Sequence, residues 1–162
     1  MITIQKARLS DLTGIRRLLI YTWIQTYRGV FSAKITAKAI PVWYGRKLLS
    51  SQLRDPSILF NIARNEKEKI VGIVAASRVN QRTLLIRRLY VHPAYQRRHI
   101  GKKLMDIAIR SFYGVKRVRL EVVRENRKAR YFYLRHGFKF IKTNKVSLNG
   151  MSLLLIVMEK GV

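Results

Sequence analysis

Apolar residues along this chain recur in some segments at every second position, as in strands, and in others at helical spacing. Together these segments predict a mixed order of strands and helices. Ile2 and Ile4 alternate with polar neighbours, as in a half-buried strand. Ser10 stands where an N-cap would begin a helix, and the apolar residues after it recur at helical spacing. That apolar set is Leu12, Ile15, Leu18, Leu19 and Trp23. A second helix is expected over residues 34–53.

Three β-rich segments fill the middle of the chain, separated by short polar turns. They cover residues 57–64, 69–79 and 84–91. Strands that follow each other at such short intervals usually pair with their neighbours in sequence. We therefore expect an antiparallel meander.

Helices and strands alternate in the C-terminal half. Helices are expected over 100–112 and 127–136, the second closed by Gly137 as its C-cap. The expected strands cover 115–123, 138–143 and 153–159. No repeat, low-complexity segment or linker interrupts this order. Residues 1–162 are therefore expected to form a single domain.

Hydropathy and composition restrict the class of protein. No apolar run reaches the roughly 18 to 20 residues of a membrane span, and the N-terminus has no export signal. We therefore expect a cytoplasmic protein without a membrane partner. The lack of cysteine excludes disulfides, thiolate nucleophiles and thiolate-bound metals. With only three histidines left as nitrogen ligands, we expect no metal site.

Charge is the most unusual property of the composition. Lysine and arginine number 34 against 8 aspartate and glutamate residues, which gives a formal net charge of +26. Residues 82–162 hold 20 of the basic residues and 4 of the acidic ones. Such an excess indicates an anionic partner, RNA or another polyanion. The alternative is a basic surface that is only solvated.

A basic loop in residues 89–104 follows an apolar strand and a proline turn, and Gly101 opens an amphipathic helix after it. Backbone N–H groups at a helix start lack partners and lie at the positive end of the helix dipole. Glycine there permits close approach of a phosphate, and Arg97, Arg98 and Lys102 add positive charge. The segment predicts a pyrophosphate site; the alternative is an ordinary strand-to-helix turn.

Two sequence motifs follow each other in this half of the chain. The first, Gln/Arg-x-x-Gly-x-Gly/Ala, aligns with residues 96–101 and follows the strand end Leu89-Tyr90-Val91. The second, Asn-x-x-Ala-x-x-Phe-Tyr-x-x-x-Gly-Phe, matches at every position, by Asn126, Ala129, Phe132, Tyr133, Gly137 and Phe138. With both motifs in this order, the chain resembles the GCN5-related N-acetyltransferases (GNAT family), which transfer an acetyl group from acetyl-CoA to an amine.

The resemblance implies a fold and a co-substrate. The α/β fold is a mixed, mostly antiparallel seven-stranded sheet with about four helices, in which strands four and five splay apart. The co-substrate is acetyl-CoA, and no metal takes part. The cofactor-binding residues that the resemblance implies are Leu89, Tyr90, Val91, Gln96, Arg97, Arg98, His99, Ile100, Gly101, Lys102, Asn126 and Ala129.

One residue departs from the family's loop, since His99 stands where the first loop glycine is usual. A side chain there costs about 1 to 2 kcal/mol if the backbone is left-handed. We expect weaker acetyl-CoA binding from this change, unless the imidazole itself meets a phosphate.

The resemblance also implies the catalytic chemistry, in which the amine attacks the thioester directly. Tyr133 matches the family's general acid for the departing thiolate; the alternative is a packing role on its helical face. Leu85 and Arg87 occupy the strand positions where many relatives carry a basic carboxylate. Glu121, twelve residues before Tyr133, is the remaining candidate, at a spacing that resembles the ribosomal-protein alanine N-acetyltransferases. The alternatives are deprotonation by water and a surface ion pair of Glu121 with Arg119.

The acceptor pocket that the resemblance implies lies between the first two helices and the sheet. There the chain carries Trp23, Tyr27 and Arg28, and further on Trp43 and Tyr44. The alternative for these aromatic residues is the core. Arg28 suits an acidic or phosphorylated acceptor, and the net charge opposes polyamines and polycationic histone tails.

Three functions stay open at the level of the sequence. The acceptor is a small molecule or an amine of a peptide or protein. Alternatively, the enzyme docks on RNA and acetylates aminoacyl-tRNA or a ribosomal protein N-terminus. The third function is that of a catalytically silent relative that binds CoA or nucleic acid. In each case we expect a monomer or a homodimer.

Overall fold

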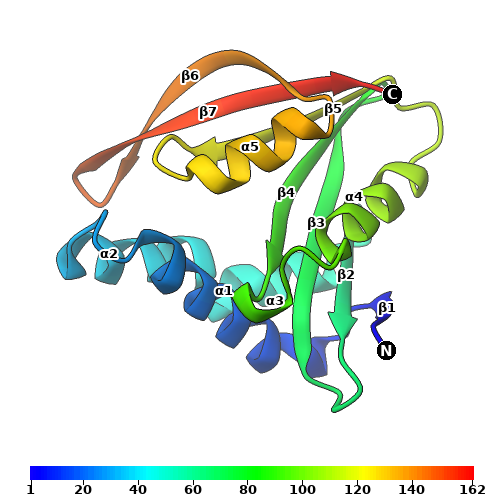
Figure 1. The fold of residues 1–162 in the computed structure, drawn as a ribbon, viewed down its shortest axis with the longest axis horizontal. Coiled ribbons are helices and arrows are strands. Elements are labelled where there is room, and N and C mark those ends of the chain that lie inside the picture. Colours follow the sequence, from blue (N-terminus) through cyan, green and yellow to red (C-terminus); the bar gives the residue numbers. More distant parts are fainter.

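Seven strands form one sheet in the computed structural model, which describes residues 1–162. They lie in the order β1-β2-β3-β4-β5-β7-β6 (Figure 1). All neighbours pair antiparallel except β4 and β5, which are parallel. The strand bounds are β1 Thr3–Lys6, β2 Ile58–Arg64, β3 Ile70–Asn80, β4 Thr83–Val91, β5 Arg117–Val123, β6 Lys139–Leu148 and β7 Met151–Gly161. The mixed, mostly antiparallel sheet is the predicted one.

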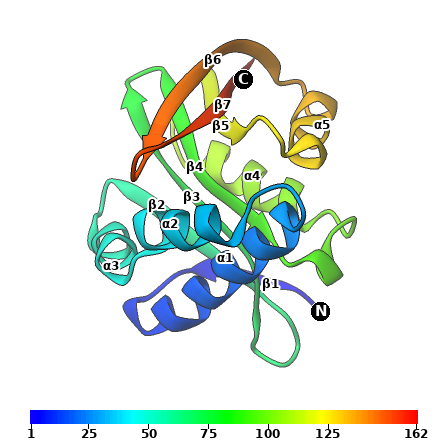
Figure 2. The same ribbon diagram turned by 90° about the vertical axis from the view of Figure 1, so that its left-hand side faces the viewer.

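Helices cover both faces of this sheet. Helices α1 to α3 pack with one buried cluster, and α4 and α5 pack with the other (Figure 2). The helix bounds are α1 Leu12–Tyr27, α2 Ala33–Tyr44, α3 Arg46–Arg54, α4 Ile100–Arg110 and α5 Arg127–Arg135. Short 3₁₀ turns at Leu9–Asp11 and Pro93–Tyr95 come before α1 and α4. The order of elements along the chain is the one predicted from the apolar pattern, except that one expected helix is divided into α2 and α3.

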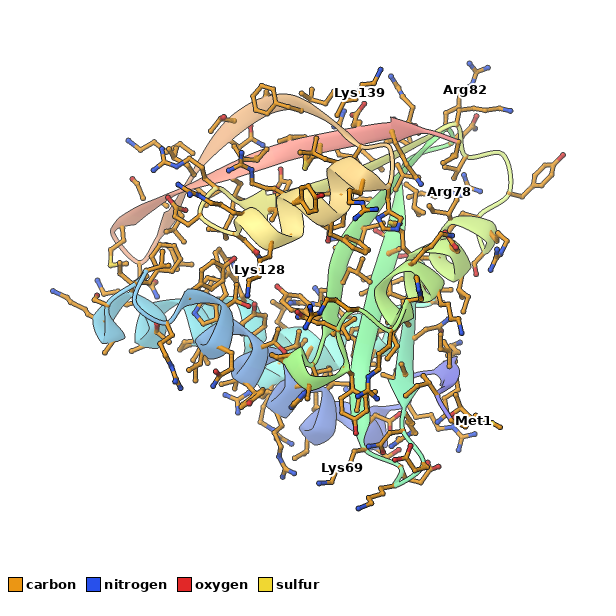
Figure 3. All side chains as sticks on the ribbon, in the orientation of Figure 1. Met1, Lys69, Arg78, Arg82, Lys128 and Lys139 are labelled. Carbon is orange, nitrogen blue, oxygen red and sulfur yellow. The ribbon has the colours of Figure 1, made fainter.

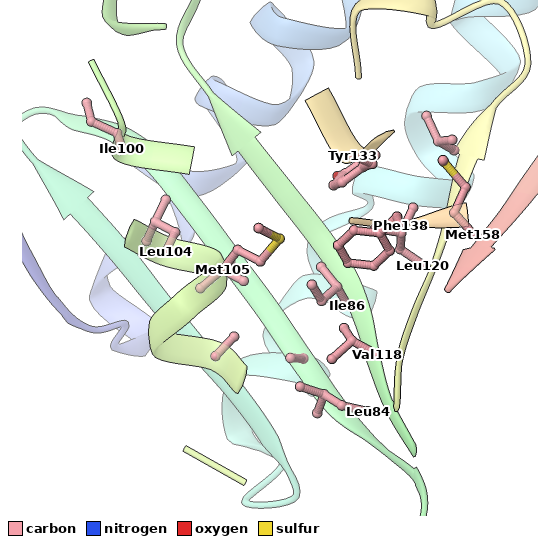
Figure 4. Packing of buried hydrophobic residues seen from close by; sticks show 14 of the residues in the cluster. Leu84, Ile86, Ile100, Leu104, Met105, Val118, Leu120, Tyr133, Phe138 and Met158 are labelled. Carbon is pink, nitrogen blue, oxygen red and sulfur yellow. The ribbon is translucent and has the colours of Figure 1, made fainter. Parts of the chain in front are cut away.

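Strand β3, an interior strand of the sheet, joins the two clusters. Its side chains point alternately to the two faces, so Ile73 and Ala75 pack with α1 to α3, whereas Val74 and Ala76 pack with α4 and α5. All four residues are fully buried, as expected for a strand covered by helices on both sides. Figure 4 shows the second cluster, which includes Leu104 and Met105 of α4 and Ile86 of β4.

Strands β4 and β5 separate part-way along their length. Their pairing runs from Thr83 and Arg117 to Ile86 and Leu120 and then ends. The register of β4 against β3 shifts between Ala75 and Ala76, which leaves Arg87 as a bulged residue. A bulge bends its strand and increases the local twist. The expected splay of strands four and five is confirmed, and Figure 1 shows the two ribbons diverging.

One predicted helix is in fact two. The expected helix over 34–53 is divided at Gly45, whose extended backbone (ψ 142°) ends α2 and begins α3. A Cβ atom on Gly45 would lie 2.6 Å from the carbonyl oxygen of Pro41, so only glycine fits there. The apolar period continues across this break and hides it. The fold therefore has five α-helices where about four were expected.

The start of the first long helix also differs from the prediction. Ser10 lies inside the 3₁₀ turn, and the residue before α1 is Asp11. The Asp11 carboxylate accepts a hydrogen bond from the Arg8 backbone N–H at 2.8 Å and forms an ion pair with Arg64 at 2.5 Å. The buried Asp11 carboxylate, and not Ser10, therefore holds the chain in place where it enters α1.

Strands β6 and β7 form a long hairpin at the edge of the sheet. Asn149 (φ 48°) and Gly150 (φ 80°) supply the two left-handed residues that a tight hairpin turn requires. Both strands extend beyond the predicted bounds, because the exposed part of β6 has no apolar alternation. The turn is fastened to α2, since Lys38 Nζ donates to the Asn149 carbonyl oxygen at 2.9 Å.

Candidate active site

The loop before α4 has an unusual backbone. Arg97 and His99 both adopt a left-handed conformation, each with φ 60°. Left-handed residues next to right-handed ones direct successive N–H groups toward one point, which is a common way to bind an anion. Gln96 ties the loop to the end of β4, because its side-chain amide donates to the Val91 carbonyl oxygen at 3.1 Å. The N–H groups of the first α4 turn follow directly after this loop and have no partner within the helix.

His99 keeps the conformation that the usual glycine would have. Its φ of 60° and ψ of 7° are left-handed, so the predicted strain applies. The side chain is exposed and makes no capping hydrogen bond to α4. The imidazole is therefore free to meet a bound anion.

The basic side chains of the loop have different partners. Lys102 forms an ion pair with Asp106 at 2.5 Å, and the guanidinium of Arg98 lies over the Tyr95 ring at 5.1 Å. Arg97 is exposed and takes part in none of the ion pairs. Arg97 is thus the loop cation with the most freedom to reach a ligand.

Helix α5 brings the second motif to the splay. The Asn126 side chain caps the helix by accepting from the Ala129 N–H at 3.1 Å. Tyr133 is buried and packs edge to face against Phe138, with 5.5 Å between ring centroids (Figure 4). Burial raises the pKa of the Tyr133 phenol well above its usual value, and nearby Tyr90 raises it further. The hydroxyl is therefore protonated at neutral pH, the state that an acid requires, and the ring is also part of the core.

Three more tyrosines gather on the opposite face of the sheet, beside the part of β4 that no longer pairs with β5. The hydroxyl oxygens of Tyr44 and Tyr90 lie 2.9 Å apart. Burial raises the pKa of Tyr27 far above its usual value; Tyr90 adds to the rise, and a hydrogen bond from Asn126 opposes it. Tyr27 therefore lies close to both Tyr90 and the N-terminus of α5. Residues from α1, α2, β4 and α5 thus meet at one place.

Arg88, which sequence reasoning missed, anchors this face. Its Nε donates to Gln52 Oε1 at 3.1 Å, its Nη2 donates to the Trp43 carbonyl oxygen at 2.9 Å, and its guanidinium lies 5.6 Å from the Tyr44 ring centroid. Burial lowers the pKa of this guanidinium. An arginine in an apolar strand is a signal that could have identified it, but the bulge at Arg87 conceals which of the two arginines points inward.

Glu121 lies on the same face as the α1 to α3 helices, opposite to Leu120 and Val122, which pack in the cluster of Tyr133. Its carboxylate is exposed and accepts from Asn144 Nδ2 at 2.9 Å. The alternative of an Arg119–Glu121 pair is wrong, because Arg119 pairs with Glu159 across β5 and β7. No direct contact joins Glu121 to the tyrosines.

The three predicted acceptor residues have different environments. Trp23 is 2% exposed, and its ring centroid lies 4.2 Å from that of Tyr27 and 5.0 Å from that of Trp43. Trp23 is therefore a core residue, as the alternative stated. Arg28 is exposed at the C-terminus of α1 and forms no ion pair. Tyr27 is buried as well, but it is the member of the set that lies close to Tyr90.

Two further features of the structure bear on its class. No group of three or more histidine, aspartate and glutamate side chains is arranged to hold a metal ion. None of the helices is long and apolar enough to cross a lipid bilayer.

A family model described as "Acetyltransferase (GNAT) family" matches residues 20–138 of the chain. This chain belongs to the GNAT acetyltransferase family. As a GNAT enzyme it is an acetyltransferase that depends on acetyl-CoA. The matched residues include the splay, the basic loop before α4 and all of α5.

Known relatives of this GNAT chain include a spermidine N(1)-acetyltransferase from Thermoplasma acidophilum. The two are 30% identical over 149 residues, which cover 88% of this chain and 91% of the relative. The crystal structure of the PaiA N-acetyltransferase from Thermoplasma acidophilum in complex with coenzyme A superimposes with a TM-score of 0.84, 26% identity and coverage of 100% and 99%. The Escherichia coli ribosomal-protein-S18-alanine N-acetyltransferase shares the fold, with a TM-score of 0.73, 19% identity and coverage of 100% and 94%.

The basic loop fits the diphosphate of CoA. Its two left-handed residues, the free N–H groups of the first α4 turn and the unpaired Arg97 all suit an anionic group. The splay beyond Ile86 leaves β4 without a partner on the β5 side, so the polar backbone groups of Leu89 to Val91 are available on that side. A CoA-binding family and this geometry therefore agree.

Proposed function

We propose that this GNAT protein, acting as a single domain over residues 1–162, acetylates a primary amine by direct attack on the thioester of acetyl-CoA. The observation that carries the proposal is the position of the β4–β5 splay. On one face it meets the anion-binding loop and Tyr133, and on the other it meets the cluster of Tyr27, Tyr44 and Tyr90. Such an opening lets two substrates approach one point from opposite sides of the sheet.

In this proposal the residues of the loop and of β4 bind the co-substrate. Backbone N–H groups of residues 97–102, with Arg97, Arg98 and Lys102, hold the diphosphate. The backbone of Leu89 to Val91 holds the pantetheine arm, and a backbone N–H there stabilises the oxyanion. Asn126 and Ala129 border the arm from α5.

The proton transfers follow from the groups beside the splay. The amine lone pair attacks the thioester carbonyl, the carbon–sulfur bond breaks, and the departing sulfur takes a proton from Tyr133 Oη. The amine loses its own proton to Glu121, through water, or to bulk water alone. Glu121 supports the first route because it lies on the face of the acceptor-side helices.

The first acceptor to test is spermidine, because a relative at 30% identity is a spermidine N(1)-acetyltransferase. The net charge of +26 opposes a polycation. However, at physiological ionic strength the field of exposed charges decays over about 8 Å, so groups at the site decide. Glu125 lies close to Tyr27 but pairs with Arg124 at 3.0 Å, whereas Glu121, on the same side, forms no ion pair.

The deciding experiment measures CoA release with a panel of amines. We expect release with spermidine and at most slow release with N-terminal peptides and aminoacyl-tRNA. Release with another member of the panel would identify that amine as the acceptor and leave the proposed acetyl transfer unchanged. No release with any amine would favour the catalytically silent relative.

A second candidate function, docking on RNA, is favoured by the surface of α5 and β6. Residues 124–145 contain eight basic residues and one acidic residue. Tyr131 in this segment is 62% exposed, and Arg135 lies 5.9 Å from its ring centroid, an arrangement that suits single-stranded RNA. Basic side chains also extend at opposite ends of the molecule, such as Lys69 and Arg82 (Figure 3), which favours a solvated surface instead.

The two alternatives for the basic surface differ in salt dependence. If several cations contact phosphates, log K for tRNA falls with log salt at a slope of about −0.7 to −0.9 per contact. Substitution of Arg127, Lys128 and Arg135 by glutamine would then reduce the slope by about two to three. An unchanged slope would exclude this surface as the docking site.

A further inference from the structure

Tyr90 stands on β4 beyond the last residue that pairs with β5. It shares a strand face with Arg88, two positions earlier, and this face is the one covered by α1 to α3. Leu89 and Val91 point to the other face, toward α4 and α5. The Tyr90 side chain thus lies on the proposed acceptor side, while its backbone lies where the pantetheine arm is expected.

Tyr44 holds the Tyr90 hydroxyl in place. The Tyr44 side chain is 1% exposed, and its hydroxyl has one hydrogen-bond partner, the Tyr90 hydroxyl at 2.9 Å. Its ring packs against Trp23 and lies beneath the guanidinium of Arg88. Because Arg88 is itself bound to Gln52 and to the Trp43 carbonyl oxygen, Tyr44 cannot move without disturbing α2 and α3.

The burial of Tyr44 sets the direction of this hydrogen bond. A buried O–H donor without a partner destabilises the fold, whereas an oxygen acceptor with a spare lone pair does so less. Tyr44 therefore donates to Tyr90. The Tyr90 oxygen keeps one lone pair, and its own O–H points away from Tyr44.

Tyr90 is the accessible member of the tyrosine cluster. Tyr27, Tyr44 and Tyr133 are buried, whereas Tyr90 is partly exposed. Tyr90 is also close enough to all three to raise the pKa of each phenol. Its side chain packs on the face of the acceptor-side helices, where the Tyr44 hydroxyl holds its own hydroxyl.

We propose that Tyr90 Oη accepts an N–H hydrogen bond from the acceptor amine and thereby directs the amine lone pair to the thioester carbonyl. Tyr44 and Arg88 are positioning residues that act through Tyr90. This inference rests on the proposed acetylation of an amine. No proton is transferred to Tyr90, so the route of the amine proton is the one described above.

A double-mutant cycle with Tyr90→Phe and Tyr44→Phe tests the inference. We expect Tyr90→Phe to lower kcat/KM for the acceptor about tenfold, the effect of one lost hydrogen bond, with acetyl-CoA affinity unchanged. Tyr44→Phe lowers the same quantity less. The double variant equals Tyr90→Phe alone, because Tyr44 acts only through Tyr90. Tyr113→Phe is the matched control, since Tyr113 is 95% exposed and lies in the connection between α4 and β5.

The outcomes separate this inference from the proposed function. If the wild type releases CoA and Tyr90→Phe keeps kcat/KM within twofold, the inference is overturned and the proposed function stands. If losses from the two single variants add, Tyr44 acts independently of Tyr90 and its positioning role is overturned. If the wild type releases no CoA with any amine, both fail together. Melting temperatures of all variants identify any loss that is due to unfolding.

Discussion

The Phe132 ring of α5 lies 3.4 Å from the place that a Cβ atom would occupy on Gly101 of α4. A methyl group at this distance is in ordinary contact, so Gly101→Ala should fold normally. Gly101→Asp is different, because its carboxylate must fit beside Phe132 at the point where we expect a diphosphate. Repulsion between these anions should weaken acetyl-CoA binding at least about tenfold.

Calorimetry with acetyl-CoA on both Gly101 variants checks this prediction. Gly101→Ala serves as the control for packing against Phe132. Equal affinity of the wild type and Gly101→Asp would place the diphosphate elsewhere.

The left-handed backbone of His99 leads to a prediction on stability. His99→Gly and His99→Ala both remove the imidazole, but only alanine keeps the strain of φ 60°. After the entropy cost of glycine is subtracted, His99→Gly should be more stable than His99→Ala by about 0.5 to 1 kcal/mol. Urea unfolding of the two variants measures the difference. Equal midpoints would mean that the loop relaxes without strain.

Tyr133→Phe should separate turnover from binding. Loss of the acid affects only the step in which sulfur departs, so we expect kcat to fall about 10²-fold, the low end for general acids. The affinity for acetyl-CoA should change less than about twofold, since the hydroxyl is not needed for binding. An unchanged kcat would make Tyr133 a packing residue.

Buried phenols should make the fold sensitive to alkali. Burial raises the pKa values of Tyr27, Tyr44 and Tyr133 in the folded chain above their ordinary value of 10.0. The unfolded chain therefore loses these protons first, and stability falls as the pH rises above about 10. Tyr133→Phe should reduce this fall, whereas Tyr113→Phe should not. Melting temperatures between pH 8 and 11 provide the measurement.

Glu121→Gln tests the base. If Glu121 relays the amine proton, the rate at neutral pH should fall by about 10²-fold, and high pH should restore part of it because free amine becomes abundant. Glu66→Gln is a suitable control, as this exposed carboxylate pairs only with the N-terminus. Superimposable pH profiles would leave water as the base.

The sequence predicted the order of strands and helices because most elements have a clear apolar period; β6, whose exposed part has none, was predicted too short. It missed the division at Gly45, because the apolar period continues through this residue. The close approach of Gly45 to the Pro41 carbonyl oxygen exists only in the folded chain. The sequence also predicted the strand face of Glu121, whereas the role of the basic loop in binding the diphosphate stays a prediction. The pair of Tyr44 and Tyr90 was out of reach, since it depends on a bulge at Arg87 and on a helix 46 residues away in sequence.

Strand β6 pairs only with β7, so its other side offers ten residues of backbone to any strand that approaches. Lys139, Lys142 and Lys145 are exposed along this edge. If two copies met edge to edge, these lysines would face one another, and their repulsion would oppose a continuous sheet. The basic residues of β6 therefore disfavour the pairing of two copies through this one edge, whatever else binds to them.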